Sequence, residues 1–302
     1  MRAFYTDHFV LPLPDGHRFP MAKYGKLRER LKTADAVSVD LQVPEAATAD
    51  QLVRVHDATY VESVTTGMLD RKAIRRIGFP WSPELVERSR RSVGATIAAC
   101  RAALEDGVSV NLAGGTHHAG VRHGEGYCVF NDAAVAVRAL QSEGRVKRVI
   151  IIDCDVHQGN GTAAIFAGDP SVFTFDLYSE HNYPFTKTEP DLGIALPDGT
   201  GDADYLAALT AHLDPTLDSG DWDLAIYVSG ADPFVGDKLG RLSLTKSGLA
   251  KRDEVVVHAC RDRAIPIAIT MAGGYAEAAD DIVDIHLTTV RIAAQAMETE
   301  RV

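Results

Sequence analysis

The chain has 302 residues, of which 46% are hydrophobic, so it can form one large hydrophobic core and does not require a second domain. Its 31 basic and 42 acidic residues give a formal charge of −11, which argues against a direct nucleic-acid partner, because phosphate binding depends on clustered lysine and arginine. The acidic excess could favour cationic lysine substrates, although a solvated acidic surface explains it more simply.

No apolar stretch approaches the roughly 20 residues that span a bilayer, and the N-terminal segment lacks the apolar run of a secretion signal. The four cysteines do not form CxxC pairs, a distribution typical of reduced, buried thiols rather than of disulfides or a thiolate metal site. We therefore expect one soluble domain over residues 1–302, without a transmembrane segment and located in the cytoplasm.

Short β-branched runs alternate with longer helical patterns, which predicts an α/β fold with a parallel sheet covered by helices. The runs predicted as strands are 108–112, 148–153, 171–176, 223–229 and 265–271. The segments predicted as helices are 83–105 with Ser82 as its N-cap, 132–143, a helix from 247 onward, and 281–297. Two stretches broken by proline and glycine, 68–81 and 180–200, are predicted to be surface loops that shape a pocket.

Four of the predicted strands lead directly into unusual polar clusters. The clusters are 114–118, 153–160, 230–233 and 272–275. Because the carboxyl ends of parallel strands lie at one edge of a sheet, where open α/β folds bind their ligands, we expect these four segments to converge on one site.

The best candidates for metal ligands are Asp155 and His157, which lie two positions apart after an apolar strand and so can face one ion. A third ligand, Asp232, can come from another strand end and leave a coordination position open for water, as catalytic zinc sites require. An ordinary buried Asp–His pair is the alternative, and a D-x-H triplet alone does not decide between them. The apolar strand favours a metal, because a buried carboxylate needs a strong partner to stay ionised.

Three further residues are candidates for catalysis. His117 and His118 follow two glycines, and adjacent imidazoles suit proton transfer near neutral pH. Tyr275 also follows two glycines, and its phenol could donate to an oxyanion. The alternatives are a tandem histidine in a surface loop, two further metal ligands, and a tyrosine that only packs. The neighbouring clusters favour the catalytic interpretation.

Together these segments resemble the zinc-dependent histone deacetylase superfamily in order and spacing. The matching motifs are Gly115-Thr116-His117-His118, Gly126-Tyr127-Cys128, 153–161, Gly230-Ala231-Asp232 and Gly273-Gly274-Tyr275. Further segments resemble its class IV branch, namely His17 with Phe19 and Lys23, 56–60, Tyr183-Pro184 and 236–243. The resemblance covers about residues 15 to 290 and implies a single-domain arginase/deacetylase fold, with a central, mostly parallel sheet flanked by helices and the active site at the strand carboxyl ends.

The resemblance also implies roles for individual residues. The metal-ligand positions are Asp155, His157 and Asp232. The catalytic positions are His118 as general base and acid, His117 as its electrostatic partner, Tyr275 as oxyanion donor, Asp153 orienting His117 and Asn160 orienting His118. Class I members have Asp at the last position, so a neutral amide there is expected to lower the pKa of His118 relative to those enzymes. Class II and class IV sequences resemble this chain in having Asn, so the difference does not argue against activity.

The substrate and cation positions follow in the same way. The substrate-binding positions are Gly126 and Tyr127 as an aromatic wall for the acyl-lysine stem, Tyr183 as the opposing wall, and Gly273. A structural potassium ion is implied on the main-chain carbonyls at Asp153, Asp155, His157, Asp176 and Leu177.

The implied activity is metal-dependent hydrolysis of the amide of Nε-acyl-lysine in a peptide or protein, with an acetyl or a longer fatty acyl group. A divalent ion activates water, His118 takes the proton, and Tyr275 holds the oxyanion. Zinc is the expected ion, and ferrous iron is compatible with the oxygen-rich ligand set. The acyl length and the oligomeric state are left open.

Three other functions are alternatives to this activity. A small-molecule amidohydrolase such as an acetylpolyamine deacetylase would use the same site behind a narrower entrance. A non-catalytic acyl-lysine-binding module is disfavoured by the presence of Tyr275 and both histidines. A binuclear manganese ureohydrolase is unlike this chain, because 114–117, 156–160 and 231–233 hold too few carboxylates for a second metal.

Overall fold

The computed structural model describes residues 1–33 and 38–298, and in this part of the chain eight parallel strands form one sheet, ordered β2-β1-β3-β8-β7-β4-β5-β6. The strands are β1 Arg2–Phe4, β2 Asp40–Gln42, β3 Val108–Asn111, β4 Val149–Asp153, β5 Val172–Ser179, β6 Leu192–Leu196, β7 Leu224–Ser229 and β8 Ile267–Met271. The predicted parallel α/β sheet is confirmed.

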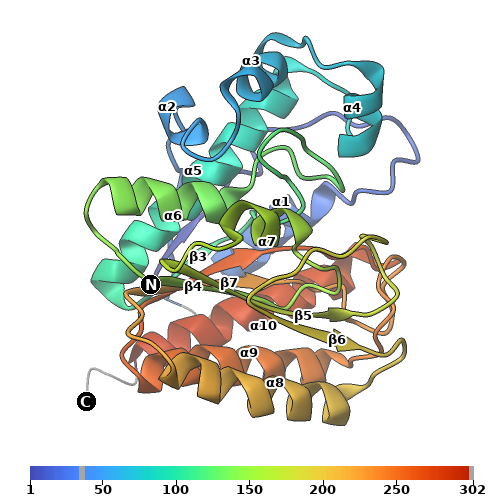
Figure 1. The fold of residues 1–302 in the computed structure, drawn as a ribbon. Coiled ribbons are helices and arrows are strands. Elements are labelled where there is room, and N and C mark those ends of the chain that lie inside the picture. The colour runs from blue at the N-terminus through green and yellow to red at the C-terminus, as the bar shows by residue number, and fades with distance from the viewer. Residues whose placement is uncertain (34–37, 299–302) are drawn as a thin grey trace.

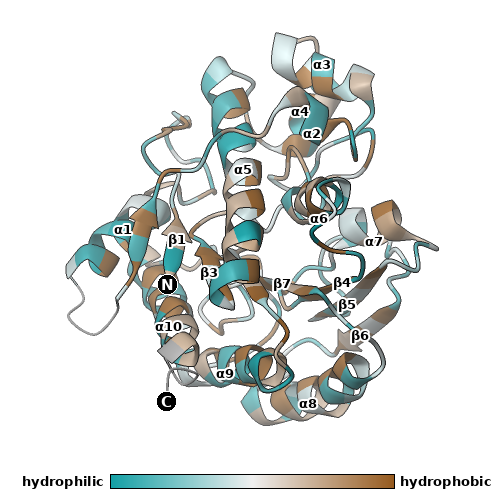
Figure 2. Cartoon of the chain, turned by 90° about the vertical axis from the view of Figure 1, so that its left-hand side faces the viewer, coloured by the Kyte–Doolittle hydropathy of each residue, from teal (hydrophilic) through white to brown (hydrophobic). Residues whose placement is uncertain are grey.

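Helices cover both faces of the sheet (Figure 1). The helices are α1 Ala22–Thr33, α2 Ala49–Leu52, α3 Ala58–Thr66, α4 Arg71–Ile77, α5 Pro83–Asp106, α6 Asp132–Ser142, α7 Asn160–Phe166, α8 Asp202–Asp218, α9 Lys246–Asp262 and α10 Ala279–Glu298. Figure 2 shows α5 and α6 on one side of the central strands, and α8, α9 and α10 on the other. None of the described helices is both long and apolar enough to cross a membrane.

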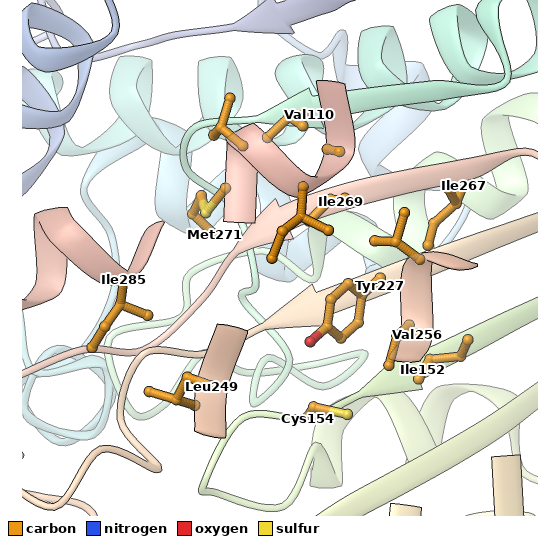
Figure 3. Packing of buried hydrophobic residues seen from close by; sticks show 14 of the residues in the cluster. Val110, Ile152, Cys154, Tyr227, Leu249, Val256, Ile267, Ile269, Met271 and Ile285 are labelled. Carbon is orange, nitrogen blue, oxygen red and sulfur yellow. The ribbon is translucent and has the colours of Figure 1, made fainter. Parts of the chain in front are cut away.

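The sheet is held by two hydrophobic clusters, one on each face. Alternate residues of β4 enter opposite clusters, with Ile150 and Ile152 facing α8 to α10 and Val149 and Ile151 facing α5 and α6. Successive side chains of a strand point to opposite faces of the sheet. A strand that is covered by helices on both faces therefore has a continuous run of apolar residues in its sequence. Figure 3 shows strand residues meeting Leu249 and Val256 of α9 in the first of these clusters.

The predicted strands and helices are all present, with ends shifted by a few residues. Ser82 caps α5 by accepting a hydrogen bond from the Leu85 N–H, as predicted. All four cysteines are buried and free.

Two predicted loops contain regular structure that was not expected. The stretch 68–81 includes α4, and 180–200 includes β6. Both elements are short and lie close to proline or glycine, so their local pattern is weak. The edge strand β2, its neighbour β1 and the helices α1, α2, α3, α7 and α8 were also not predicted. In α8 the interior Pro215 obscures the helical pattern.

Candidate active site

The four polar clusters meet, because the strands that precede them are neighbours in the order β3-β8-β7-β4. Three of them line a cavity of about 440 Å³, with His117, His118, Asp155, His157 and Tyr275 among the lining residues, and Asp232 of the fourth contacts His157 beside it. The convergence predicted from the strand ends is therefore observed.

Asp155, His157 and Asp232 are buried, and one ligand atom from each lies within 4.8 Å of the others. His157 Nδ1 lies 2.9 Å from Asp155 Oδ1 and 3.2 Å from Asp232 Oδ2. Asp232 Oδ2 has no hydrogen-bond partner among the described residues. Two carboxylates and an imidazole around one buried point fit a divalent cation, which would supply the charge that ionised buried carboxylates need.

The pKa values in this cluster reflect its concentrated charge. Burial and the neighbouring Asp155 carboxylate raise the pKa of Asp232 to about 7. Although burial lowers it, the adjacent carboxylates of Asp155 and Asp232 raise the pKa of His157 to about 10. The raised pKa of Asp232 shows that a further positive charge at this point would favour its ionised form.

Glycines make room for the two carboxylates. A Cβ at Gly273 would lie 1.8 Å from Asp232 Oδ2, so no side chain fits there. The Gly273 N–H donates to Asp155 Oδ2 at 2.8 Å, and the Val156 N–H donates to Asp232 Oδ1 at 3.0 Å. Gly273, predicted as a substrate-binding position, lines the cavity and also holds a predicted metal ligand.

Each of the two histidines lies within hydrogen-bond distance of the residue predicted to orient it. His117 Nδ1 lies 2.6 Å from Asp153 Oδ2, and His118 Nδ1 lies 2.7 Å from Asn160 Oδ1. Because an amide oxygen can only accept, His118 carries its proton on Nδ1 and keeps Nε2 free to accept another.

The pKa values of the two histidines move in opposite directions. Burial, together with the positive charges of His117 and His157, holds the pKa of His118 well below its usual range. Against the effect of burial, the carboxylates of Asp153 and Asp155 raise the pKa of His117 to about 9. At neutral pH the pair therefore comprises a neutral imidazole beside a cationic one, an arrangement that separates base from electrostatic stabiliser.

Asn160 is itself held by Glu125, a residue that sequence reasoning missed. Asn160 Nδ2 donates to Glu125 Oε1 at 2.6 Å, and Arg76 donates to Glu125 Oε2. These contacts connect His118 to the surface through Asn160, Glu125 and Arg76. No local pattern marks Glu125, which lies in an irregular loop.

Tyr275 is partly buried beside the metal-ligand cluster, with its ring centroid 6.4 Å from that of His157. Burial and the charges of Asp232 and Asp155 hold the pKa of its phenol well above the usual range, so it remains a donor. Its backbone N–H donates to Asp237 Oδ2 at 2.6 Å. Asp237, a second missed residue, thereby fixes the backbone that carries the phenol.

The walls of the cavity are formed by aromatic residues. Gly126 and Tyr127 adopt left-handed backbone conformations with φ of 57° and 67°, and a Cβ at Gly126 would lie 2.6 Å from His118. The ring of Tyr183 lies 4.9 Å from that of His118. Tyr127 and Tyr183 both line the cavity, where an aliphatic chain could pass between them and reach His118.

Two buried cations support the site from behind: Arg252, which was missed, and Lys23, which the family resemblance included without assigning it a role. Arg252 of α9 donates through Nη1 to the carbonyls of Cys154 and Gly230, at 3.1 and 2.7 Å. Lys23 of α1 donates to the carbonyls of Ala272 and Gly274, both at 3.3 Å. Arg252 could have been noticed, because it lies at helical spacing between the buried residues Leu249 and Val256.

The predicted potassium positions lie at and just after the end of β4 and within the adjacent strand β5. Asp153 pairs with Asp176 in the strand register, and Leu177 follows. Asp176 Oδ2 accepts a hydrogen bond from the Gly159 N–H, whereas its buried Oδ1 has no partner among the described residues. Burial and the charge of Asp153 hold the pKa of Asp176 well above its usual range. A cation beside this unpartnered oxygen would satisfy it.

Known proteins share this domain. Residues 17–290 match the model of the histone deacetylase domain. An uncharacterized protein of Picosynechococcus sp. is 43% identical over 291 residues, which cover 96% of this chain and 97% of the relative. Histone deacetylase 2 of Arabidopsis thaliana is 31% identical over 270 residues, which cover 86% of this chain and 70% of the relative.

Solved structures agree on the fold. The HD domain of HDA15 superimposes with a TM-score of 0.82 at 23% identity, over 97% of this chain and 88% of that one. An HDAC homolog complexed with SAHA gives a TM-score of 0.81 at 21% identity, over 99% and 88% of the two chains. With its matching domain, its similarity to a plant relative and its fold, this chain belongs to the histone deacetylase family.

Proposed function

We propose that the protein is a metal-dependent lysine deacylase that hydrolyses the amide of Nε-acyl-lysine. The observation that carries the proposal is one cavity whose lining brings His118 and Tyr275 together with Asp155 and His157, two members of the buried cluster that Asp232 completes. Family membership supports hydrolysis of an acylated amine, and the relatives that bear the histone deacetylase name make acyl-lysine the first substrate to test.

Asp155, His157 and Asp232 would hold the metal, and zinc suits this mixed set of oxygen and nitrogen donors. Bound there, the ion would polarise the acyl carbonyl and lower the pKa of water at the site. Asp153, Asp176 and Leu177, with the carbonyls of Asp155 and His157, would hold a structural potassium ion nearby.

His118 then acts as the general base. Its free Nε2 accepts the proton of the attacking water, and Asn160 keeps the ring in the tautomer that makes this possible. The same nitrogen afterwards delivers the proton to the leaving lysine amine. His117 stays protonated beside Asp153 and stabilises negative charge as it develops. Tyr275 donates its phenolic hydrogen to the oxyanion.

The cavity favours a short acyl group. Behind Tyr127 and Tyr275 lies a smaller cavity of about 60 Å³, lined by Phe19, Phe79 and Leu85 among others. On this measure one water needs roughly 10–15 Å³, so the space would hold a few waters and has room for an acetyl group, whereas a long fatty chain would have to displace these aromatic and aliphatic walls. We therefore propose acetyl-lysine as the preferred substrate, and long acyl chains, which the class IV resemblance suggested, as the poorer ones.

The test is turnover of acetyl, octanoyl and myristoyl lysine peptides by purified protein, before and after chelation and metal restoration. We expect stoichiometric metal, chelator-sensitive hydrolysis, and the highest kcat/KM for the acetyl peptide. Asp232→Asn is the matched inactive variant. Hydrolysis that is indifferent to chelation would contradict a metal role, and binding of the peptides without turnover would indicate a recognition module instead.

A further inference from the structure

The mouth of the active-site cavity is basic, although the chain as a whole is acidic. Three arginines line the mouth, Arg18 from the loop before α1 and Arg75 and Arg76 from α4. Among the described residues that line the cavity, the only carboxylate is Asp155, which belongs to the metal-ligand cluster. The formal charge of −11 is therefore not a guide to the surface that a substrate meets first.

Helix α4 is fixed against the aromatic wall. The Gly126 N–H donates to the carbonyl of Arg76 at 3.1 Å, and the Tyr127 N–H donates to the carbonyl of Ile77 at 2.7 Å. Asp70 caps the start of the helix by accepting from the Ala73 N–H. The arginines of α4 are therefore presented at a defined place beside the residue that would hold the lysine stem.

The three arginines at the mouth differ in whether they already form an ion pair with a carboxylate. Arg76 pairs with Glu125 and is balanced. Arg75 is exposed and donates through Nε to the carbonyl of Arg71, and within the described chain it has no carboxylate partner; neither has Arg18. Burial raises the pKa of Tyr127, and the positive charge of Arg18 opposes that rise, which places Arg18 close to the aromatic wall.

We propose that Arg18 and Arg75 select substrates that carry a carboxylate beside the acylated amine, above all acyl-lysine flanked by Asp or Glu. A guanidinium presents a planar fork of donors that matches a carboxylate, and two unpaired guanidinium groups at one mouth favour an anionic partner. The inference rests on the deacylase function and names the substrate class of that site. Acylated polyamines and lysine-rich peptide segments would meet like charge and be disfavoured.

The experiment compares acetyl-lysine peptides of equal length whose flanking residues are acidic, neutral or basic. We expect kcat/KM at low ionic strength to be roughly five- to twentyfold higher for the acidic than for the basic peptide, because each exposed ion pair contributes modestly. The difference should appear mainly in KM, since the contact is present before and during reaction, and it should shrink at high salt.

The charge-reversed variant Arg18→Glu/Arg75→Glu should invert the preference, so that its kcat/KM is higher for the basic than for the acidic peptide. Its control is Arg54→Glu/Arg291→Glu, which alters the net charge equally at exposed residues that do not line the cavity. The control should keep the wild-type preference, which separates a local contact from a change in overall charge.

A free carboxylate could also come from a small molecule, so Nε-acetyl-lysine is compared with its amide. An arginine-dependent preference for the free acid supports the carboxylate contact and identifies an acylated amino acid as its source, whereas a preference confined to peptides identifies acidic side chains. Equal rates on acidic and basic peptides, or a preference unchanged in Arg18→Glu/Arg75→Glu, would overturn the inference while leaving deacylation intact. Failure to hydrolyse any acyl-lysine would instead refute the proposed function.

Discussion

The floor and the mouth of the cavity are built in opposite ways. The floor, defined by Asp155, His157, Asp232 and His118, lies at strand ends, is buried, and places each side chain in close contact with another. The mouth, defined by the three arginines Arg18, Arg75 and Arg76, lies on a loop and a short helix, and its side chains are exposed.

This difference suggests a division of roles, in which the floor carries out the reaction and the mouth selects the substrate. A buried polar group without partners costs free energy, so the geometry of the floor is constrained by the surrounding sheet. Exposed arginines are solvated and impose no such constraint, so the mouth can change its charge without disturbing the floor. The predictions below test whether this separation holds.

The largest effect is expected from removing a floor carboxylate. Asp232→Asn should lower kcat by on the order of 10³-fold or more and reduce bound metal. The reason is that the substitution removes one of the two negative charges that compensate the charge of the bound ion. Metal content by elemental analysis and turnover of an acetyl-lysine peptide measure the two effects. Asp15→Asn, at an exposed residue, is the control and should match the wild type. Full metal content with near-normal turnover in Asp232→Asn would remove this residue from the ligand set.

Tyr275→Phe should lower kcat by roughly 10²- to 10³-fold with little change in KM, as is typical for the loss of one oxyanion donor. The metal content should be unchanged, because the phenol is not a member of the cluster. The control is Tyr5→Phe, at a partly exposed tyrosine outside the cavity. A variant that loses affinity for the substrate but keeps its kcat would show that Tyr275 packs against the substrate rather than stabilising the oxyanion.

His56 supports the floor from behind through two hydrogen bonds, and it must be neutral to make both of them. His56 Nδ1 lies 3.0 Å from the carbonyl of Gly120, and its Nε2 accepts from the Asn131 N–H at 3.0 Å. Asn131 Nδ2 in turn donates to the carbonyl of Ala119, next to His118. Burial lowers the pKa of His56 to about 4, so its contribution to stability is present above pH 6.5 and is lost as the pH falls towards 4.

The free energy of unfolding should therefore fall by about 3 kcal/mol more between pH 6.5 and pH 4 in the wild type than in His56→Gln, whose amide can replace both hydrogen bonds without titrating. Urea unfolding across this range measures the two slopes. His258→Gln, at an exposed histidine, should retain the wild-type slope. Parallel slopes for His56→Gln and the wild type would mean that His56 titrates normally.

The metal-ligand cluster of the floor was predictable from sequence because its residues directly follow recognisable strands. A strand end places Asp155 and His157 two positions apart on one side, and an apolar run before them identifies the strand. Parallel topology then brings Asp232 to the same edge. The assignments of Asn160 to His118 and of Asp153 to His117 came from the family resemblance, and both pairs are within hydrogen-bond distance in the structure.

The supports and the mouth were not predictable in this way. Glu125 and Asp237 act through contacts with segments distant in sequence, and such contacts leave no periodic signal. Helix α4 has only seven residues and follows no clear apolar repeat, so 68–81 was predicted as a loop and its arginines were not placed at the mouth. Tertiary packing, rather than local propensity, decides both features.

Arg76 belongs to the mouth but is connected to the floor by a chain of hydrogen bonds through Glu125 and Asn160 to His118. This chain is where a change at the mouth is most able to affect catalysis, so it provides a test of whether mouth and floor act independently. Asn160→Asp would place a second carboxylate against Glu125. Two effects are expected: repulsion that disturbs the orientation of His118, and a raised pKa of His118, because a nearby anion favours the imidazolium.

We expect kcat/KM of Asn160→Asp to fall about tenfold near neutral pH, the scale of a lost orienting contact, and the acidic limb of its pH profile to move to higher pH, because His118 acts as a base only when neutral. The double variant Asn160→Asp/Glu125→Gln removes the repulsion but keeps the new anion beside His118. It should therefore recover much of the lost kcat/KM, while the acidic limb of its pH profile remains at the higher pH. Glu125→Gln alone is the control. If the double variant instead recovers nothing, the loss arises from the floor itself, and Glu125 and Arg76 do not connect the mouth to catalysis.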